Sequence, residues 1–204
     1  MAGLRRITVS LDTLDPDVFL RMSGGRGDLY ANIRPARSRA GLPHWGRTPM
    51  DLVFARENTE GFYADRSMYQ GSGEFMPTAD MALSVRKITE RACMRIARSA
   101  FEIARGRRKK VTAVHKANVM KVTDGLFLRS VRKVAEEYSD VALDDVIVDA
   151  AAALLVRDAA RFDVIVTTNM FGDILSDLAS ELSGSLGLAA SLNAGTDHAM
   201  AQAQ

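Results

Sequence analysis

The second half of this 204-residue chain alternates apolar runs of strand length with segments whose apolar residues recur at helical spacing. Strands that alternate with helices predict an α/β fold built from packed layers. We expect strands over 111–115, 145–149 and 163–168, a helix capped by Thr123, and helices over 150–158 and 171–183.

The first half is interrupted by glycine and proline. Alternation of Ile7, Val9 and Leu11 with polar residues predicts a strand over 4–11. Further expectations are loops at 22–28 and 35–49, a short buried strand at 51–55, and an extended loop or β-arm over 57–77.

Residues 80–105 allow two interpretations. Apolar residues recur every three or four positions from Val85 to Ile103, which is typical of one long helix. Alternatively, Met81 to Val85 form a strand, and the helix begins after Thr89 as its N-cap. The pattern leaves both open.

Composition excludes several classes of protein. Charged residues make up 25% of the chain and hydrophobic residues 47%, with a net charge of +2, which favours a soluble globular protein over a disordered one. The longest apolar run, 150–156, is far shorter than the roughly 20 residues that cross a membrane. No apolar stretch follows the first six residues, and Cys93 is the single cysteine. We therefore expect a cytoplasmic protein without membrane association or an intrachain disulfide.

Acidic residues are concentrated in the last third of the chain. Residues 139–204 hold ten acidic and two basic side chains, whereas residues 1–50 hold eight basic and four acidic ones. A polyanionic ligand bound through a divalent cation would use both groups. The alternative is an uneven charge distribution with no ligand attached to it.

Three aspartates are candidate metal ligands. Asp173 and Asp177 follow an apolar strand and lie four positions apart, on one face of the expected helix. A cation between them would offset their repulsion, and oxygen ligands suit Mg²⁺ or Mn²⁺. Asp149, at the end of another expected strand, is a possible third ligand. The alternatives are solvated carboxylates near a helix N-terminus and, for Asp149, a helix N-cap. The expected buried stripe of the 171–183 helix is Ile174, Leu175, Leu178 and Leu182.

Basic side chains also lie beside the expected strands. Arg34 and Arg56 each accompany a strand-like stretch, and guanidinium groups match carboxylates with two parallel hydrogen bonds. Lys116 follows a strand, where a partly desolvated amine can relay protons. Ordinary surface salt bridges are the alternative for all three.

Two other segments give weaker signals. The basic run 105–110 contains no aromatic residue and follows an expected helix, so we interpret it as a solvated turn and expect no nucleic-acid partner. The segment from Gly184 to Gly187 is a weak phosphate-loop signal, and a helix C-cap at Gly184 is the alternative.

Taken together and in order, these segments resemble the isocitrate, homoisocitrate and isopropylmalate dehydrogenases, a family of β-decarboxylating hydroxyacid dehydrogenases. The motifs that carry the resemblance are LYANIRPAR (29–37), RENTEGFY (56–63), VHKANVMK (114–121), IVDAAAALLV (147–156), FDVIVTTNMFGDILSDLASELSGSLGLA (162–189) and AGTDHAMAQAQ (194–204). The resemblance implies an NAD(P)-dependent enzyme that oxidises a 2-hydroxy acid carrying a carboxylate at C3 and releases CO₂. RENTEG resembles the isocitrate and homoisocitrate branches, and VHKANVMK followed by TDGLF (123–127) resembles the isocitrate branch. The resemblance therefore implies a substrate of the isocitrate or homoisocitrate type first, with isopropylmalate and tartrate or malate types next.

The resemblance also implies roles for individual residues. Arg34 and Arg56 would bind the departing carboxylate of the substrate, and Tyr63 and Lys116 would be the catalytic acid/base pair. The residues implied for the metal are Asp149, Asp173 and Asp177, with Mg²⁺ or Mn²⁺, and those implied for the cofactor are Asn118, Gly184 and Gly187. Family members are homodimers with shared active sites, so Lys116 and Asp149 would serve the partner subunit's site.

The resemblance implies an isopropylmalate dehydrogenase-like layered fold with an incomplete nucleotide-binding domain. Residues 30–183 would form the smaller dimerisation domain, with a β-arm near 62–78, and 1–29 and 184–204 would be pieces of the larger domain. Gly24 stands where the family has another substrate arginine. A non-catalytic dimerisation subunit or a truncated remnant of such an enzyme is therefore the alternative.

Overall fold

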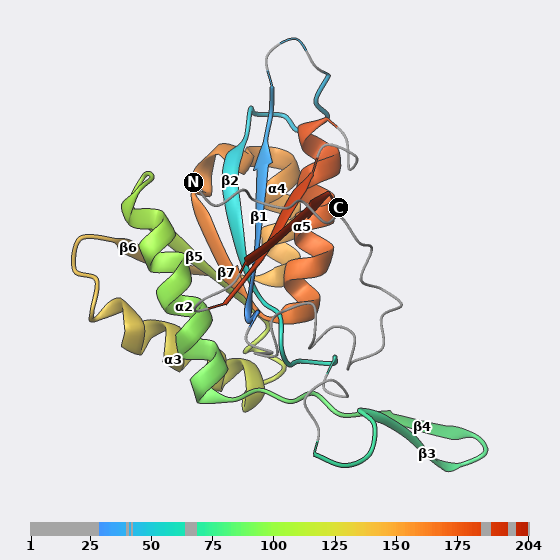
Figure 1. Ribbon diagram of the computed structural model, residues 1–204. Helices are drawn as coiled ribbons and strands as arrows, with labels where there is room; N and C mark the ends of the chain where they lie inside the picture. The colour runs from blue at the N-terminus through green and yellow to red at the C-terminus, as the bar shows by residue number, and fades with distance from the viewer. Residues whose placement is uncertain are drawn as a thin grey trace, which may run out of the picture.

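The computed structural model describes residues 29–39, 41, 43–63, 69–184, 189–195 and 199–203. Seven of its described strands form a mixed sheet in the order β6-β5-β7-β2-β1-β8-β9, with α2 and α3 on one face and α4 and α5 on the other (Figure 1). The strands are β1 (Ala31–Arg37), β2 (Asp51–Glu57), β5 (Lys110–His115), β6 (Ala142–Ile147), β7 (Val164–Thr167), β8 (Ala190–Ala194) and β9 (Ala199–Ala203). The helices are α2 (Glu90–Arg105), α3 (Thr123–Ala135), α4 (Val148–Asp158) and α5 (Asn169–Ser183), with a 3₁₀ turn at Ala159–Arg161. The layered α/β fold that the sequence predicts is confirmed.

The register of the parallel strands brings their carboxyl ends to one edge of the sheet. β2 runs parallel to β7 with Arg56 opposite Thr167, and β5 runs parallel to β7 with Val114 opposite the same threonine. In sheets of this kind, ligands bind at that edge. Arg56, the turn that carries Lys116 and the start of α5 therefore share one region of the fold.

Two apolar layers hold the helices to the sheet. On one face, α2 and α3 contribute residues such as Ile96, Phe101 and Phe127, each fully buried. On the other face, α4 and α5 contribute Leu155 and Leu175. This second layer packs α5 against β1 and β2. The packing fixes the position of the polar face of α5 relative to both strands.

The second interpretation of residues 80–105 is confirmed. Met81–Ser84 form strand β4, which pairs with β3 (Glu74–Thr78) in a hairpin whose strand residues are all exposed (Figure 1). Helix α2 begins at Glu90, and the Thr89 side chain accepts a hydrogen bond from the Ala92 amide, which is N-cap geometry.

Several boundaries differ from the prediction. Pro35, which we expect in a loop, lies in β1. Because β8 pairs only with residues 31–33, β1 is an edge strand on that side at Pro35, where a proline is tolerated. Strand β6 ends at Ile147, so Asp149 lies in the first turn of α4 and is neither a strand end nor the N-cap. The described hairpin begins at Glu74, later than the arm predicted near 62–78.

Two side-chain predictions are wrong. The N-cap of α3 is Val122, which has no side-chain acceptor, and the Thr123 hydroxyl instead accepts from Arg86. Ile174 is 59% exposed and lies outside the buried stripe of α5, which is formed by Leu175, Ala179 and Leu182.

The strand predicted over 4–11 and the loop predicted over 22–28 lie outside the described residues. Among the residues that are described, no helix is both long enough and apolar enough to span a membrane.

Candidate active site

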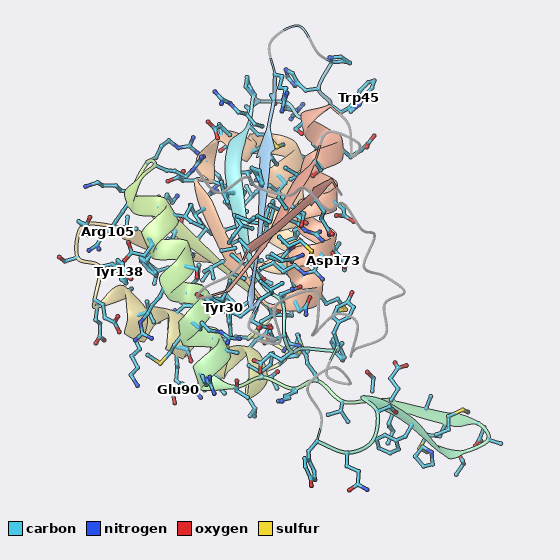
Figure 2. The ribbon with its side chains drawn as sticks, viewed as in Figure 1. Tyr30, Trp45, Glu90, Arg105, Tyr138 and Asp173 are labelled. Atoms are coloured by element: carbon cyan, nitrogen blue, oxygen red, sulfur yellow. The ribbon has the colours of Figure 1, made fainter. Side chains whose placement is uncertain are left out.

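Three side chains from three segments converge on the carboxylate of Asp173. Arg34 Nη1 donates to Asp173 Oδ1 at 3.0 Å, and Arg56 Nη1 donates to the same oxygen. The Tyr63 hydroxyl donates to Asp173 Oδ2 at 3.2 Å. Arg34 Nη1 also reaches Asp177 Oδ1 at 3.2 Å, so both aspartates of α5 contact one guanidinium nitrogen. Figure 2 shows Asp173 on the α5 side of the molecule, away from Arg105 at the end of α2.

The strand register explains why the two arginines meet. Arg34 lies opposite Phe54 across the antiparallel pair β1–β2, and Arg56 is two residues further along β2. Residues opposite each other, or two apart, project from the same face of a sheet. Because Phe54 belongs to the apolar layer beneath α5, both arginines project from the face that α5 covers.

Arg56 is fixed by contacts to both its guanidinium group and its aliphatic stem. Its Nε and Nη2 donate to Asn169 Oδ1 at 2.9 and 2.6 Å, and Asn169 Nδ2 donates to the Glu60 carbonyl at 3.0 Å. Gly172 lies under its aliphatic stem, and the Tyr63 ring centroid is 5.8 Å from Cζ. Burial lowers the pKa of Arg56, although the neighbouring Asp173 opposes the change. Neither Asn169 nor Gly172 is predicted as a site residue, and their signal in the sequence is their position at the start of a helix after a strand.

The carboxylates of Asp173 and Asp177 fit a divalent cation in kind, as oxygen donors. Burial raises the pKa of Asp177, while Arg34 acts in the opposite direction and Asp173 adds to the rise. Carboxylate oxygens are the ligands that Mg²⁺ and Mn²⁺ prefer. In the described ranges, however, no three acidic, histidine or cysteine side chains gather as a metal site. The described part of the chain therefore has two neighbouring carboxylates at α5 and no third such side chain gathered with them.

Lys116 and Asp149 form a second, separate group. Lys116 Nζ donates to Asp149 Oδ1, and this hydrogen bond lowers the pKa of Asp149. Asp149 has a 69% exposed side chain, and Asn118, in the turn after β5, is also exposed. Within the described residues, the hydrogen bonds and ion pairs of Lys116 and Asp149 do not connect this group with Asp173.

The glycines proposed for a cofactor are only partly described. Gly184 ends α5 with φ +137°, and a Cβ there would lie 2.7 Å from the Pro43 carbonyl oxygen. Loop packing at a helix C-cap therefore accounts for this glycine. Gly187 lies outside the described residues.

The basic run 105–110 is paired with carboxylates. Arg105 and Lys109 approach Asp140, and Arg107 Nε donates to the buried Asp163 at 2.8 Å. Lys110 Nζ lies 2.9 Å from Asp144. These contacts tie the turn to the amino ends of the parallel strands, opposite the edge where Asp173 lies.

Known proteins resemble the chain over most of its length. A sequence profile described as isocitrate/isopropylmalate dehydrogenase matches residues 18–203. A 3-isopropylmalate dehydrogenase of Saccharolobus solfataricus is 50% identical over 175 residues, which is 85% of this chain and 48% of that protein. An isocitrate/homoisocitrate dehydrogenase of Thermus thermophilus is 49% identical over 172 residues, 83% of this chain and 48% of that protein.

A solved structure shares the fold. The crystal structure of isocitrate dehydrogenase from Methylococcus capsulatus superposes with a TM-score of 0.80 at 44% identity, covering 97% of this chain and 57% of that one. The chain thus spans about half the length of the curated relatives it matches.

Proposed function

The chain belongs to the isocitrate/isopropylmalate dehydrogenase family, and on that premise we propose that it carries the substrate- and metal-binding part of a decarboxylating dehydrogenase. The reaction oxidises a 2-hydroxy acid with a carboxylate at C3. NAD(P)⁺, when bound, would take the hydride from C2. The C3 carboxylate would then leave as CO₂, and C3 would gain a proton. The observation that carries the proposal is the convergence of Arg34, Arg56 and Tyr63 on Asp173.

Each of these side chains suits one part of the reaction. Arg34 and Arg56 would bind the C3 carboxylate, because each guanidinium already contacts a carboxylate in this position. The Tyr63 hydroxyl, held beside Arg56, would deliver the proton to C3. Mg²⁺ or Mn²⁺, held by Asp173 and Asp177, would supply Lewis acidity at the C2 oxygen when bound.

The separation of the second group supports a shared site. Lys116 and Asp149 of this chain do not join the Asp173 cluster in the described residues, yet they have the chemistry of a general base and a metal ligand. In a homodimer, the partner subunit's Lys116 would accept the C2 hydroxyl proton, and the partner subunit's Asp149 would complete the metal ligands. Each chain would then contribute to two sites.

The substrate order is part of the proposal. RENTEG at 56–61 favours an isocitrate or homoisocitrate type first, with isopropylmalate and tartrate or malate types next. The relatives bear names from both branches at 49% and 50% identity, so overall likeness does not separate them. NAD is the expected cofactor, with NADP as the alternative.

The proposal is tested by following NADH or NADPH formation at 340 nm with Mn²⁺ and isocitrate, homoisocitrate, isopropylmalate, tartrate or malate. Turnover with at least one of them, lost in Arg56→Met, is the expected result. A folded dimer that turns over none of these acids would contradict the proposal and favour the non-catalytic dimerisation subunit.

A further inference from the structure

A buried ion pair, Arg86 with Asp124, lies between the two groups of candidate residues. Arg86 Nη1 donates to Asp124 Oδ1, and their side chains are 8% and 0% exposed. Neither residue belongs to the site described above. Arg86 follows the β3–β4 hairpin, and Asp124 lies in the first turn of α3.

Arg86 contacts the segment that carries Tyr63 and the helix that carries Asp173. Its Cζ lies 5.8 Å from the ring centroid of Phe62 and 5.5 Å from that of Phe171. Its Nη2 donates at 3.0 Å to the hydroxyl of Thr168, which occupies the N-cap position of α5. An N-cap threonine ordinarily accepts a hydrogen bond from a backbone amide of its own helix. The Thr168 hydroxyl makes no such bond and accepts from Arg86 instead.

Asp124 extends the same network to the Lys116 turn. Its Oδ2 accepts the backbone amide of Lys116 at 2.5 Å, while Oδ1 accepts from Arg86. The turn has a second such anchor, because the Ala117 amide donates to His115 Nδ1 at 3.0 Å. Both oxygens of Asp124 are thus used to join Arg86 to the backbone at Lys116.

The location of Arg86 is electrostatically costly. Its guanidinium lies at the N-termini of both α3 and α5, where the helix dipole favours negative charge, and only the Asp124 carboxylate is paired with it in the described contacts. A buried ion pair is often replaceable by packed apolar residues without loss of stability. The burial of this pair is therefore weak evidence for a role in core stability.

We propose that Arg86 and Asp124 are positioning residues that fix the Lys116 turn relative to the Tyr63 segment and α5 of the same chain. The inference rests on the proposed function, in which Lys116 serves one site and Tyr63 and Asp173 serve another. The pair would then fix the position of Lys116, which this chain supplies to one site, relative to Tyr63 and Asp173, which it supplies to the other.

The test compares Asp124→Asn with the double variant Arg86→Met/Asp124→Leu. Asparagine has one acceptor oxygen for two donors, so Asp124→Asn leaves either Arg86 or the Lys116 amide without its acceptor. The double variant removes the charges together and restores apolar packing. The matched control is Glu137→Gln, which breaks the exposed Arg98–Glu137 pair.

The readout is hydrogen exchange of the Ala117 amide by NMR, with Tm recorded alongside, because this amide of the same turn donates to His115 Nδ1 and keeps its acceptor in every variant. A positioning role predicts exchange more than about tenfold faster in the double variant, even where its Tm returns to that of the parent chain. Glu137→Gln should leave exchange unchanged. Exchange that recovers together with Tm would overturn the proposal, because the pair would then be only structural.

Activity separates this inference from the proposed function. If the parent chain turns over a substrate, the double variant should lose kcat at least about tenfold more than KM changes, since the proton transfer depends on Lys116. A parent chain without turnover would contradict the proposed function alone, and the exchange measurement would still decide whether the pair fixes the Lys116 turn.

Discussion

The side chain of Arg56 crosses the α-carbon of Gly172 so closely that a Cβ at this glycine would lie 2.6 Å from Arg56 Cγ and 2.8 Å from its Cβ. No side chain fits between α5 and β2 at this point. The glycine therefore sets where the guanidinium reaches Asp173, although it contributes no chemistry of its own.

Gly172→Ala should displace Arg56 and weaken its contacts with Asn169 and Asp173. Overpacking of this kind costs about 1–3 kcal/mol, measurable by urea unfolding. We expect a raised KM for the substrate as well. Gly125→Ala is the matched control, because its Cβ meets only the flexible end of Arg129 at 3.3 Å inside α3, and it should stabilise by about 0.5–1 kcal/mol. Equal effects of the two changes would contradict the steric argument.

Glu60 predicts a pH dependence of stability. Burial raises its pKa above the ordinary value, although two hydrogen bonds from Thr89 oppose the rise. Between its unfolded pKa, about 4.3, and the higher folded value, the native state binds more protons, so the free energy of unfolding falls as pH rises. Glu60→Gln removes this term, so the stability of the variant relative to the parent should increase across that window. Parallel curves from urea unfolding between acidic and neutral pH would be inconsistent with it.

Asp173→Asn tests the metal site directly. Loss of one carboxylate should weaken Mn²⁺ binding more than about tenfold by calorimetry or electron paramagnetic resonance, since hard cations prefer charged oxygen ligands. Asp158→Asn, an exposed change at the end of α4, serves as the control. Equal affinity in both variants would show that the α5 carboxylates are surface charges held by arginines.

The basic run at 105–110 is expected to act through stability. Arg107→Ala leaves Asp163, 1% exposed, without the Nε donor at 2.8 Å and should cost roughly 2–4 kcal/mol, somewhat less than a fully buried pair. Arg98→Ala breaks an exposed pair and should cost about 0–1 kcal/mol. Thermal unfolding distinguishes them, and a similar small loss for both would show that Asp163 is satisfied in other ways.

Local signals in the sequence were sufficient for much of the fold. Thr89 marked the start of α2 because a threonine before an amphipathic run is a strong N-cap. The same rule failed at Thr123, since a turn bonded through Val122 begins α3 and Arg86 takes the threonine hydroxyl. Ile174 was misplaced because periodicity locates the centre of the buried stripe, formed by Leu175, Ala179 and Leu182, more sharply than its edge, where Ile174 is exposed.

The candidate site was predictable only in part. Arg34, Arg56 and Asp173 were recognised from motifs, and the structure brings them together. No role was predicted for Arg86 or Asp124, and their pairing joins positions 38 residues apart. Contacts of that kind depend on the packing of α3 against the rest of the chain, which local spacing does not encode.

The ion pairs around Asp173 have a thermodynamic consequence for ligand entry. A cation drawn to Asp173 and Asp177 would compete with Arg34 and Arg56 for the same oxygens, and an incoming organic acid would compete with those aspartates for the same guanidinium groups. A bound cation would release the guanidinium groups that the organic acid needs, and a bound organic acid would release the carboxylates that the cation needs. Binding of the two would resemble an exchange of partners, so by linkage each would raise the affinity for the other, and neither alone would be held as tightly.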